Sequence, residues 1–400
     1  MPTANCQLPT GMGFLTAKHI HNGHGWLPSG SVIEVSDDGL IISILDKPHP
    51  EAVFYEGILA PGFINAHCHL ELSHMKGLVP EHTGLIPFLK NIPKHRNDFN
   101  AEQKKTARYN AHEELLSNGV VALGDIANTT DTLDVRAIDK LHFCTFVESI
   151  GFAEINAQKF FGFAKETYNA FAEQVGGKKR LMQSIVPHAP YSVSFSLFKL
   201  INTHRDDVLI SIHNQESEEE NRYFTTKEGH ISDLFHSLGI DDSLFTPSGL
   251  SSLQSFTDWL SPGHPFIFVH NTYSKREDVQ HAHSRIQEVY WCLCPNANLY
   301  IENTLPDIDM FISEGANICI GTDSLASNHQ LCILSELYSI KERYPHLDWE
   351  TLITWATRNG AYALQMQDIT GTIEIGKMPG IIQINGLDNA GVKPAVKRIV

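Results

Sequence analysis

Basic residues are scarce in this sequence. Lysine and arginine together number 30 against 46 aspartates and glutamates, which gives a formal net charge of −16. Proteins that bind nucleic-acid polymers hold the phosphate backbone with clustered lysine and arginine. The acidic balance therefore argues against a nucleic-acid polymer as a partner and favours a small-molecule substrate.

Long apolar runs are missing as well. No stretch approaches the roughly 18 uninterrupted apolar residues of a membrane-spanning helix, and the first twenty residues lack the basic start and apolar block of a secretory signal peptide. We therefore expect a cytoplasmic protein that does not enter a membrane.

Cysteine is sparse and odd in number. Disulfide frameworks belong to short secreted chains with an even number of cysteines. Here several cysteines lie in apolar strand-like runs such as Ile318-Cys319-Ile320. We therefore expect buried free thiols in a reducing compartment. The seven cysteines are Cys6, Cys68, Cys144, Cys292, Cys294, Cys319 and Cys332.

The middle of the chain has the pattern of a parallel α/β protein. Between residues 61 and 369, apolar runs alternate with stretches of helical period. The span from Gly62 to Asp323 matches a (β/α)8 TIM barrel, which takes roughly 250 residues. A last helix is expected over 349–365, with Asp348 as its N-cap. The eight predicted strands are 62–67, 120–126, 142–148, 182–188, 208–213, 265–270, 290–294 and 317–323.

The two ends of the chain differ from this middle part. Residues 1–60 and 370–400 contain short strand patterns separated by turn signals. We expect the two ends to build one small β domain together, a β-sandwich, beside the catalytic domain of residues 61–369. The strand patterns lie at 31–35, 40–45, 371–377 and 380–384.

One connection between predicted strands is unusually long. A plain strand-helix-strand step takes about 30 residues or more, and the segment from His213 to His270 clearly exceeds that length. Because it leaves the carboxyl end of a barrel strand, it would overhang an active site and act as a lid. A surface insertion without a role is the equally weighted alternative.

Histidine is abundant, with 22 residues, and some histidines occupy a special position. Five of the eight predicted strands end in a residue that can bind a metal or work beside one. In a barrel these ends converge on one site. A lone His-x-His pair is more often just two hydrogen-bonded polar side chains, but candidate ligands at several strand ends of one barrel together favour a metal site. The residues are His67 and His69, His188, His213, His270 and Asp323.

Strand geometry suggests how these residues share an ion. Residues i and i+2 of a strand face the same side, so His67 and His69 can bind one ion while Cys68 points away. An imidazole from His213 and a carboxylate from Asp323 would complete a set that leaves room for water, as catalytic sites require.

A carboxylate follows the third ligand candidate. Glu216 lies three residues after His213, and it can serve as a proton shuttle. The alternative is a solvated acidic run, because Glu218, Glu219 and Glu220 follow. The barrel context favours the shuttle.

At this point the chain resembles the metal-dependent amidohydrolase superfamily. Within it, the resemblance is to the chlorohydrolase and aminohydrolase branch, which includes guanine deaminase, S-adenosylhomocysteine deaminase and aminodeoxyfutalosine deaminase. CPNAN at 294–298 is similar to the family's Cys-Pro-x-Ser-Asn stretch, with Ala297 replacing serine. The other matching segments are PGFINAHCHL at 61–70, PHAPY at 187–191, HNQE at 213–216, VH at 269–270, GTDS at 321–324 and GTIEIGK at 371–377.

The resemblance implies a role for each strand-end residue. One divalent metal, zinc in the first place and iron as the alternative, would be bound by His67, His69, His213 and Asp323. Dinuclear relatives carry a lysine on strand four, and none occurs in 182–188, which points to a mononuclear site. The remaining implied roles are Glu216 as acid/base, His270 as the residue that orients the hydroxide, and His188 as a substrate contact.

The implied reaction is hydrolytic deamination of an amino-substituted heterocycle, such as a purine nucleoside derivative. A metal-bound hydroxide would attack, Asp323 would take the water proton, and Glu216 would donate a proton as ammonia leaves. Hydrolysis of a cyclic amide, or of another C–N or C–Cl bond, stays open as an alternative. A non-catalytic binding barrel is disfavoured because the acid/base set is complete. The sequence leaves a homo-oligomer open.

Two other hydrolytic chemistries lack their motifs. The second zinc deaminase family needs a P-C-x-x-C segment, and serine hydrolases of the α/β type need G-x-S-x-G. Neither motif occurs in this chain.

Overall fold

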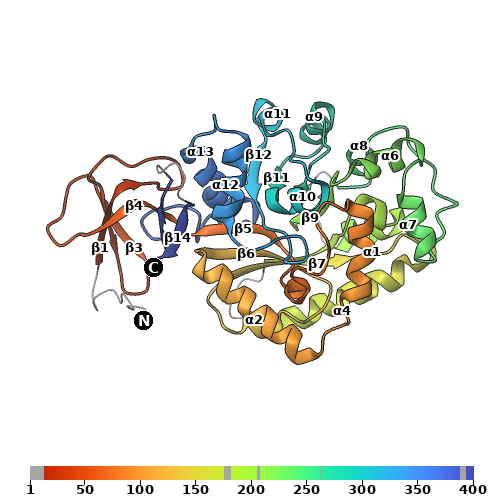
Figure 1. Cartoon of the computed structure of the whole chain (residues 1–400), viewed down its shortest axis with the longest axis horizontal. Helices are drawn as coiled ribbons and strands as arrows, with labels where there is room; N and C mark the ends of the chain where they lie inside the picture. The colour runs from red at the N-terminus through yellow and green to blue at the C-terminus, as the bar shows by residue number, and fades with distance from the viewer. Residues whose placement is uncertain (1–12, 175–181, 205–207, 262, 388–392) are drawn as a thin grey trace. The chain divides into compact units, whose positions relative to one another are not determined.

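The computed structural model describes residues 13–174, 182–204, 208–261, 263–387 and 393–400 (Figure 1). The six cysteines within this part are free, while Cys6 lies outside it. The chain divides into two compact units. The first comprises Met1–Ile64, Leu116–Val121 and Ile333–Val400, and the second comprises Asn65–Leu115 and Ala122–Cys332.

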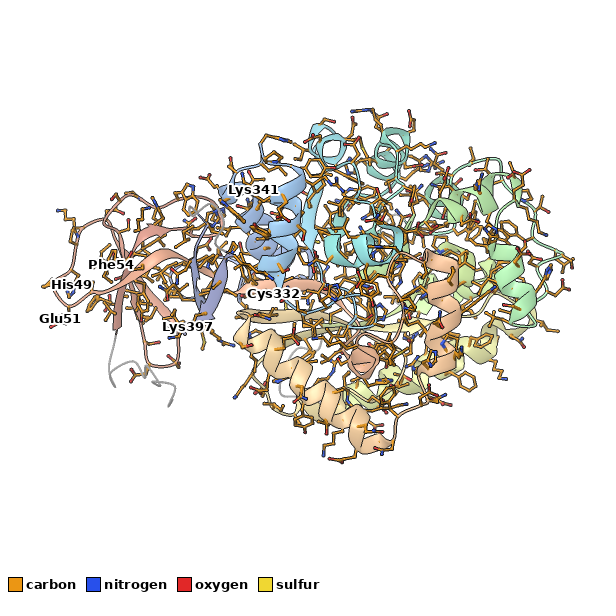
Figure 2. The ribbon with its side chains drawn as sticks, in the orientation of Figure 1. His49, Glu51, Phe54, Cys332, Lys341 and Lys397 are labelled. Carbon is orange, nitrogen blue, oxygen red and sulfur yellow. The ribbon has the colours of Figure 1, made fainter. Side chains whose placement is uncertain are left out.

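The first unit contains a six-stranded sheet built from both ends of the chain. Its strand order is β14-β13-β4-β1-β2-β3, and of its pairs only β1 with β4 is parallel. One side chain of this sheet, Phe54 on β4, is more than half exposed (Figure 2). The strands are β1 Gly13–Ile20, β2 Val32–Val35, β3 Ile41–Leu45, β4 Val53–Pro61, β13 Ile381–Asn385 and β14 Ala395–Arg398.

Sequence patterns located most of these elements. The hairpin predicted from 31–35 and 40–45 is β2 and β3, and the strand predicted at 380–384 is β13. The strand predicted at 371–377 is wrong. Gly371 and Gly376 both have positive φ, at 87° and 88°, so the backbone turns there instead of extending.

The helix predicted over 349–365 is confirmed with an irregular middle. Asp348 caps it, because its Oδ1 accepts a hydrogen bond from the Thr351 amide at 2.7 Å. A single π-helical turn then interrupts the regular α-helix; π-helix is rare and occurs mostly as such single turns inside α-helices. The helical elements of this unit are α12 Ile333–Arg343, α13 Trp349–Thr354, the π-turn η4 Trp355–Asn359 and α14 Gly360–Ala363.

The eight predicted barrel strands all exist and form two parallel sheets, with orders β5-β6-β7-β8 and β12-β11-β10-β9. Every residue of β6 is buried, for example, as expected for parallel strands covered on both faces. The α/β class is therefore confirmed. The strands are β5 Phe63–Cys68, β6 Val120–Ala127, β7 His142–Ser149, β8 Met182–Pro187, β9 Ile210–Asn214, β10 Phe266–His270, β11 Val289–Leu293 and β12 Asn317–Ile320.

One strand boundary needs a correction. The run 317–323 was expected to be extended as far as Asp323, but β12 ends at Ile320. Gly321, Thr322 and Asp323 turn away from the strand, and the amides of Thr322 and Asp323 both donate to the His67 carbonyl at 3.1 Å. Asp323 is thus fixed to the end of β5 by its own backbone.

Helices connect and cover these strands (Figure 1). None of the helices in the described ranges is long and apolar enough to cross a membrane. The helices are η1 Leu70–Met75, α1 Leu85–His95, α2 Ala101–Ser117, α3 Leu133–Arg136, η2 Glu154–Asn156, α4 Ala157–Gln174, η3 Pro190–Ser192, α5 Phe195–His204, α6 Glu218–Thr226, α7 Ile231–Ser237, α8 Ser252–Thr257, α9 Arg276–Arg285, α10 Pro295–Glu302 and α11 Ile308–Ser313.

The long connection between His213 and His270 folds into three helices, α6, α7 and α8. Its aromatic side chains pack on one another, with the Tyr223 and Phe245 rings stacked at 4.4 Å between centroids. Tyr223 and Phe235 are also buried in a larger apolar cluster that includes Leu85. The connection is therefore an integral, packed part of its unit.

We predict that replacing Gly321 with alanine disturbs the end of β5. A Cβ at this position would lie 2.9 Å from the Cβ and carbonyl oxygen of His67 and 3.0 Å from Cys292 Sγ. Overpacking of this kind costs about 1–3 kcal/mol. Urea unfolding should therefore show Gly321→Ala to be less stable by that amount.

A glycine with free space around it provides the matched control. Gly162 lies within α4, and a Cβ there would meet nothing within 4 Å. Gly162→Ala should stabilise the protein by about 0.5–1 kcal/mol. Equal stabilities of the two variants would contradict the proposed close approach at Gly321.

Candidate active site

Four buried side chains meet where the strands end. His67 is in β5, His69 follows it, His213 is in β9, and Asp323 follows β12. Asp323 Oδ1 lies 3.5 Å from His67 Nε2 and 3.4 Å from His69 Nε2, and the Nε2 atoms of His69 and His213 are 3.2 Å apart. One ligand atom from each of the four lies within 4.8 Å of all the others.

The backbone is sharply bent around this cluster. Gln215, His270, Asn271 and Asp323 have positive φ values of 45°, 73°, 59° and 56°. Non-glycine residues seldom adopt this left-handed conformation, and those that do gather at functional sites. Tertiary hydrogen bonds hold it, such as the one from the Asn271 amide to the Asn214 carbonyl at 3.0 Å.

The cluster fits a divalent metal. Among the described residues, neither ring nitrogen of His67 has a hydrogen-bond partner. Burial lowers the pKa of His67 and lowers the pKa of His69 to about 3, so both imidazoles are neutral at pH 7 and offer lone pairs. Three neutral imidazoles and one carboxylate form the ligand set of a catalytic zinc or ferrous site.

The carboxylate of the cluster is ionised. Burial alone would raise the pKa of Asp323, but the close imidazoles of His67, His69 and His270 outweigh this effect and hold the pKa well below its usual range. Ser327 Oγ also donates to Asp323 Oδ2. Asp323 therefore contributes a negative charge to the cluster.

Outer contacts orient two of the imidazoles. His213 Nδ1 donates to the His188 carbonyl at 2.8 Å, so its Nε2 presents a lone pair to the cluster. His270 Nδ1 donates to Asn298 Oδ1 at 2.8 Å, which fixes the ring and directs Nε2 the other way. Asn298 is the last residue of the CPNAN segment, so this segment supplies the group that holds the His270 ring.

Glu216 lies beside His270. Its Oε1 is 3.7 Å from His270 Nε2, and burial raises the pKa of Glu216 to about 7. Glu216 is not part of a solvated acidic run, because Glu216 and Glu220 are buried, Glu219 is half-buried and Glu218 alone of these four is exposed. A carboxyl with this pKa can hold a proton near neutral pH and release it, as an acid catalyst must.

His188 follows β8 and faces the same space. Its ring centroid is 4.8 Å from that of His213, and its Nδ1 is hydrogen-bonded to Ser192 Oγ at 2.6 Å. Burial lowers its pKa to about 4, so the ring is neutral at pH 7. All seven predicted site residues thus lie close together, and six of them, all but His67, line one cavity.

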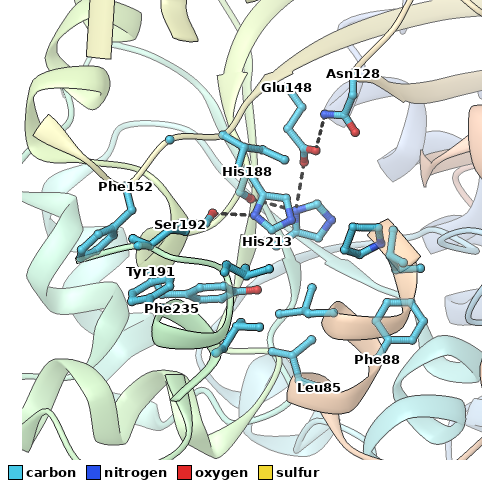
Figure 3. Close-up of a pocket in the computed structure, with 18 of the residues that line it drawn as sticks. Leu85, Phe88, Asn128, Glu148, Phe152, His188, Tyr191, Ser192, His213 and Phe235 are labelled. Carbon is cyan, nitrogen blue, oxygen red and sulfur yellow. Dashed lines mark hydrogen bonds and ion pairs between the residues drawn. The ribbon is translucent and has the colours of Figure 1, made fainter. Parts of the chain in front are cut away.

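A cavity of about 700 Å³ opens in front of the cluster (Figure 3). This volume is within the range of drug-sized ligand pockets. Helix α1 and the α6–α8 connection supply much of its apolar wall. The long connection between His213 and His270 thus forms part of the cavity lining. The apolar lining includes Leu85, Phe88, Phe152, Tyr191, Leu234 and Phe235.

Sequence reasoning missed three polar residues of the cavity, Asn128, Arg96 and Glu148. Asn128 and Arg96 have no motif that would mark them, but Glu148 ends the predicted strand 142–148 and its position was the available signal. Burial raises the pKa of Glu148 to about 7. Among the residues that the structure describes, a second potential ligand group, Glu148 with His188 and His213, shares His213 with the first.

Known proteins resemble this chain over most of its length. Adenosine deaminase of Helicobacter pylori is 27% identical over 353 residues, covering 86% of this chain and 83% of that protein. Aminodeoxyfutalosine deaminase of Nitratiruptor sp. is 26% identical over 342 residues, covering 83% of this chain and 81% of its own.

Solved structures share the fold. Helicobacter pylori aminofutalosine deaminase in complex with methylthio-coformycin superimposes with a TM-score of 0.77 at 22% identity, covering 97% of this chain and all of the other. An adenosine deaminase from Xanthomonas campestris with bound zinc gives 0.73 at 20% identity, with 95% and 86% covered. The family model described as "Amidohydrolase family" matches residues 58–398. The chain therefore belongs to the amidohydrolase family.

Proposed function

We propose that this protein is a metal-dependent aminohydrolase that removes ammonia from an amino-substituted heterocycle, with a purine nucleoside derivative as the leading substrate class. One observation carries the proposal. The buried acid Glu216 and the oriented imidazole of His270 lie beside the His67–His69–His213–Asp323 cluster, at the end of a large cavity. The deaminase names of the related proteins support it.

We also propose that the two parallel sheets close into a (β/α)8 barrel within residues 61–369. Hydrogen bonds at both junctions support closure, from the His213 amide to the His188 carbonyl at 2.9 Å and from the Asp323 amide to the His67 carbonyl. The segments 1–60 and 370–400 would form the small β-sandwich. A cytoplasmic location and a homo-oligomeric state stay predictions.

The proposed cofactor is a single zinc ion, with iron as the alternative. His67, His69, His213 and Asp323 would hold it. When bound, such an ion lowers the pKa of a coordinated water from 15.7 towards about 7, which supplies a nucleophile at neutral pH.

The protein's own groups divide the proton transfers. Asp323, the ionised carboxylate of the cluster, accepts the proton of the attacking water. His270, held by Asn298, orients that water towards the carbon that bears the amino group. Glu216 enters protonated and donates to the nitrogen, so that ammonia leaves. His188, which lines the same cavity with its ring 4.8 Å from that of His213, contacts the heterocycle.

We predict that the protein binds a single equivalent of zinc and is stabilised by it. Binding at a hundred times the Kd adds about 2.7 kcal/mol to the stability of the folded state. Chelation should therefore lower Tm, and zinc should restore it. Elemental analysis should show that His213→Ala loses the metal.

The matched control is His188→Ala, which removes an imidazole next to His213 but outside the proposed ligand set. It should retain the metal. Retention by His213→Ala, or loss from His188→Ala alone, would refute the proposed ligands.

We predict that Glu216→Gln abolishes most of the turnover. The amide cannot donate a proton as a carboxylic acid does, so kcat should fall by about 10²–10⁴-fold with the metal content unchanged. Ammonia release from a panel of purines, pterins and triazines provides the assay. Cyclic amide or C–Cl hydrolysis would instead consume substrate without ammonia.

Glu218→Gln is the control, since Glu218 lies only two residues after Glu216, at the start of α6, but is exposed. Its kcat should stay within about twofold of the wild type, because exposed substitutions change free energies by about 0.5 kcal/mol or less. Undiminished turnover of a metal-loaded Glu216→Gln protein would rule out the acid role.

A further inference from the structure

A second cavity, of about 270 Å³, lies in the first unit, whereas the metal-ligand candidates belong to the second. Its volume is just below the range of about 300–1,000 Å³ found for drug-sized ligand pockets, so it suits a smaller molecule. The lining comes from His24, from Arg358 and Tyr362 in the last helical segment, and from the stretch between Gln367 and Lys377.

Arg358 brings an unpaired positive charge to this cavity. It lies in the π-turn η4, and single π-turns of this kind are frequent at functional sites. Its side chain is half-buried, and its Nε has no hydrogen-bond partner. Within the described chain, no carboxylate forms an ion pair with the guanidinium. The guanidinium lies over the Tyr362 ring, 5.5 Å from its centroid, which holds the group without neutralising it.

The second cation of the lining, Lys377, is already paired. Its Nζ lies 3.0 Å from Glu374 Oε2 and donates to Thr372 Oγ1 at 2.7 Å. His24 Nε2 lies 2.9 Å from the other oxygen of Glu374. Hydrogen bonds from His24 and Lys377 lower the pKa of Glu374 to about 2, so this carboxylate is ionised at neutral pH. Glu374 therefore neutralises Lys377 and is not the partner of Arg358.

Two acceptors of the same lining are also without partners. Asp368 is exposed and forms no ion pair or hydrogen bond within the described residues, so it does not pair with Arg358 either. Gln367 Oε1 is buried and accepts no hydrogen bond from that part of the chain. The cavity thus presents one unpaired cation together with an unpaired carboxylate and an amide oxygen.

This set of charges matches a zwitterion better than a simple anion. Lys377 and Glu374 cancel each other, and Arg358 and Asp368 leave the lining without net charge. A phosphate dianion would be repelled by the two carboxylates of so small a cavity. A guanidinium has a planar fork of N–H donors that fits a carboxylate, while an ammonium group donates to carboxylate and amide oxygens.

We propose that this cavity binds a small α-amino acid, whose carboxylate pairs with Arg358 and whose ammonium group donates to Asp368 and Gln367. None of these three residues takes part in the deamination proposed above, so the two proposals stand independently. A hydrogen bond to a charged group corresponds to about tenfold or more in affinity, which sets the size of the expected effects.

The test compares three probes of similar size that differ in one group. L-alanine carries both charges, L-lactate has a hydroxyl in place of the ammonium group, and L-alaninamide has a carboxamide in place of the carboxylate. Calorimetric titration of the full-length protein should show that L-alanine binds at one site. L-lactate and L-alaninamide should each bind about tenfold or more weakly.

Two variants separate the two ends of the ligand. Arg358→Gln should weaken L-alanine binding by about tenfold or more. Asp368→Asn should weaken L-alanine binding several-fold without weakening L-lactate, and it remains informative if Arg358→Gln fails to fold, because Asp368 is exposed. Arg343→Gln is the matched control, since Arg343 is an exposed arginine of the same unit outside the cavity lining. It should bind L-alanine as the wild type does.

Four results would overturn the proposal. The wild type could fail to bind L-alanine, or it could bind L-alanine and L-lactate equally well. Inorganic phosphate could displace L-alanine at equal concentration, which would show a simple anion site. Undiminished L-alanine binding by Arg358→Gln would place the bound amino acid elsewhere on the protein.

Discussion

The convergence of three neutral imidazoles on one buried carboxylate is the constraint on which the rest of the site depends. His67 and His69 reach Asp323 from the end of β5 and His213 from the end of β9, and burial keeps the rings of His67 and His69 uncharged. Lone pairs packed this closely in a low-dielectric interior repel one another unless a cation or shared proton lies between them. A divalent metal relieves that repulsion, and the folded state is then stabilised by binding it.

The strand ends are bent to make this convergence possible. Asp323 lies three residues beyond β12, and its left-handed backbone is held by the His67 carbonyl. His270 has the same backbone conformation at the end of β10 and is fixed by Asn298. Such strain persists only where surrounding contacts over-determine it, and it gives the acid/base groups fixed positions before substrate arrives.

Much of this could be predicted from the sequence, for a physical reason. Parallel strands buried on both faces are continuous apolar runs, so β5 to β12 were visible, and polar residues at their ends identified His67, His213 and His270. The bend before Asp323 could not be seen, because it depends on a hydrogen bond to a residue far away in the chain. The strand prediction for 371–377 followed the apolar residues of that segment and gave too little weight to its glycines, which turn the backbone in the structure.

The polar lining of the cavity could not be predicted from the sequence either. Glu148 ended a predicted strand, yet a single glutamate has no ligand spacing and attracts no attention until its burial is known. Its environment depends on two neighbours. Asn128 donates a hydrogen bond to one carboxyl oxygen, and the hydrogen of His213 Nδ1 is directed to the His188 carbonyl instead. Partners of this kind come from several strands and are set by tertiary packing alone.

The central claim is metal-dependent hydrolytic deamination, and single-turnover ammonia release tests it most directly. Apoprotein, prepared by chelation, is mixed with adenosine or a related aminopurine nucleoside before and after addition of a stoichiometric amount of zinc or ferrous iron. We expect no ammonia from the apoprotein and, with the metal restored, as much ammonia as nucleoside consumed. Ammonia release that does not depend on the metal, or nucleoside consumed without ammonia, would contradict it.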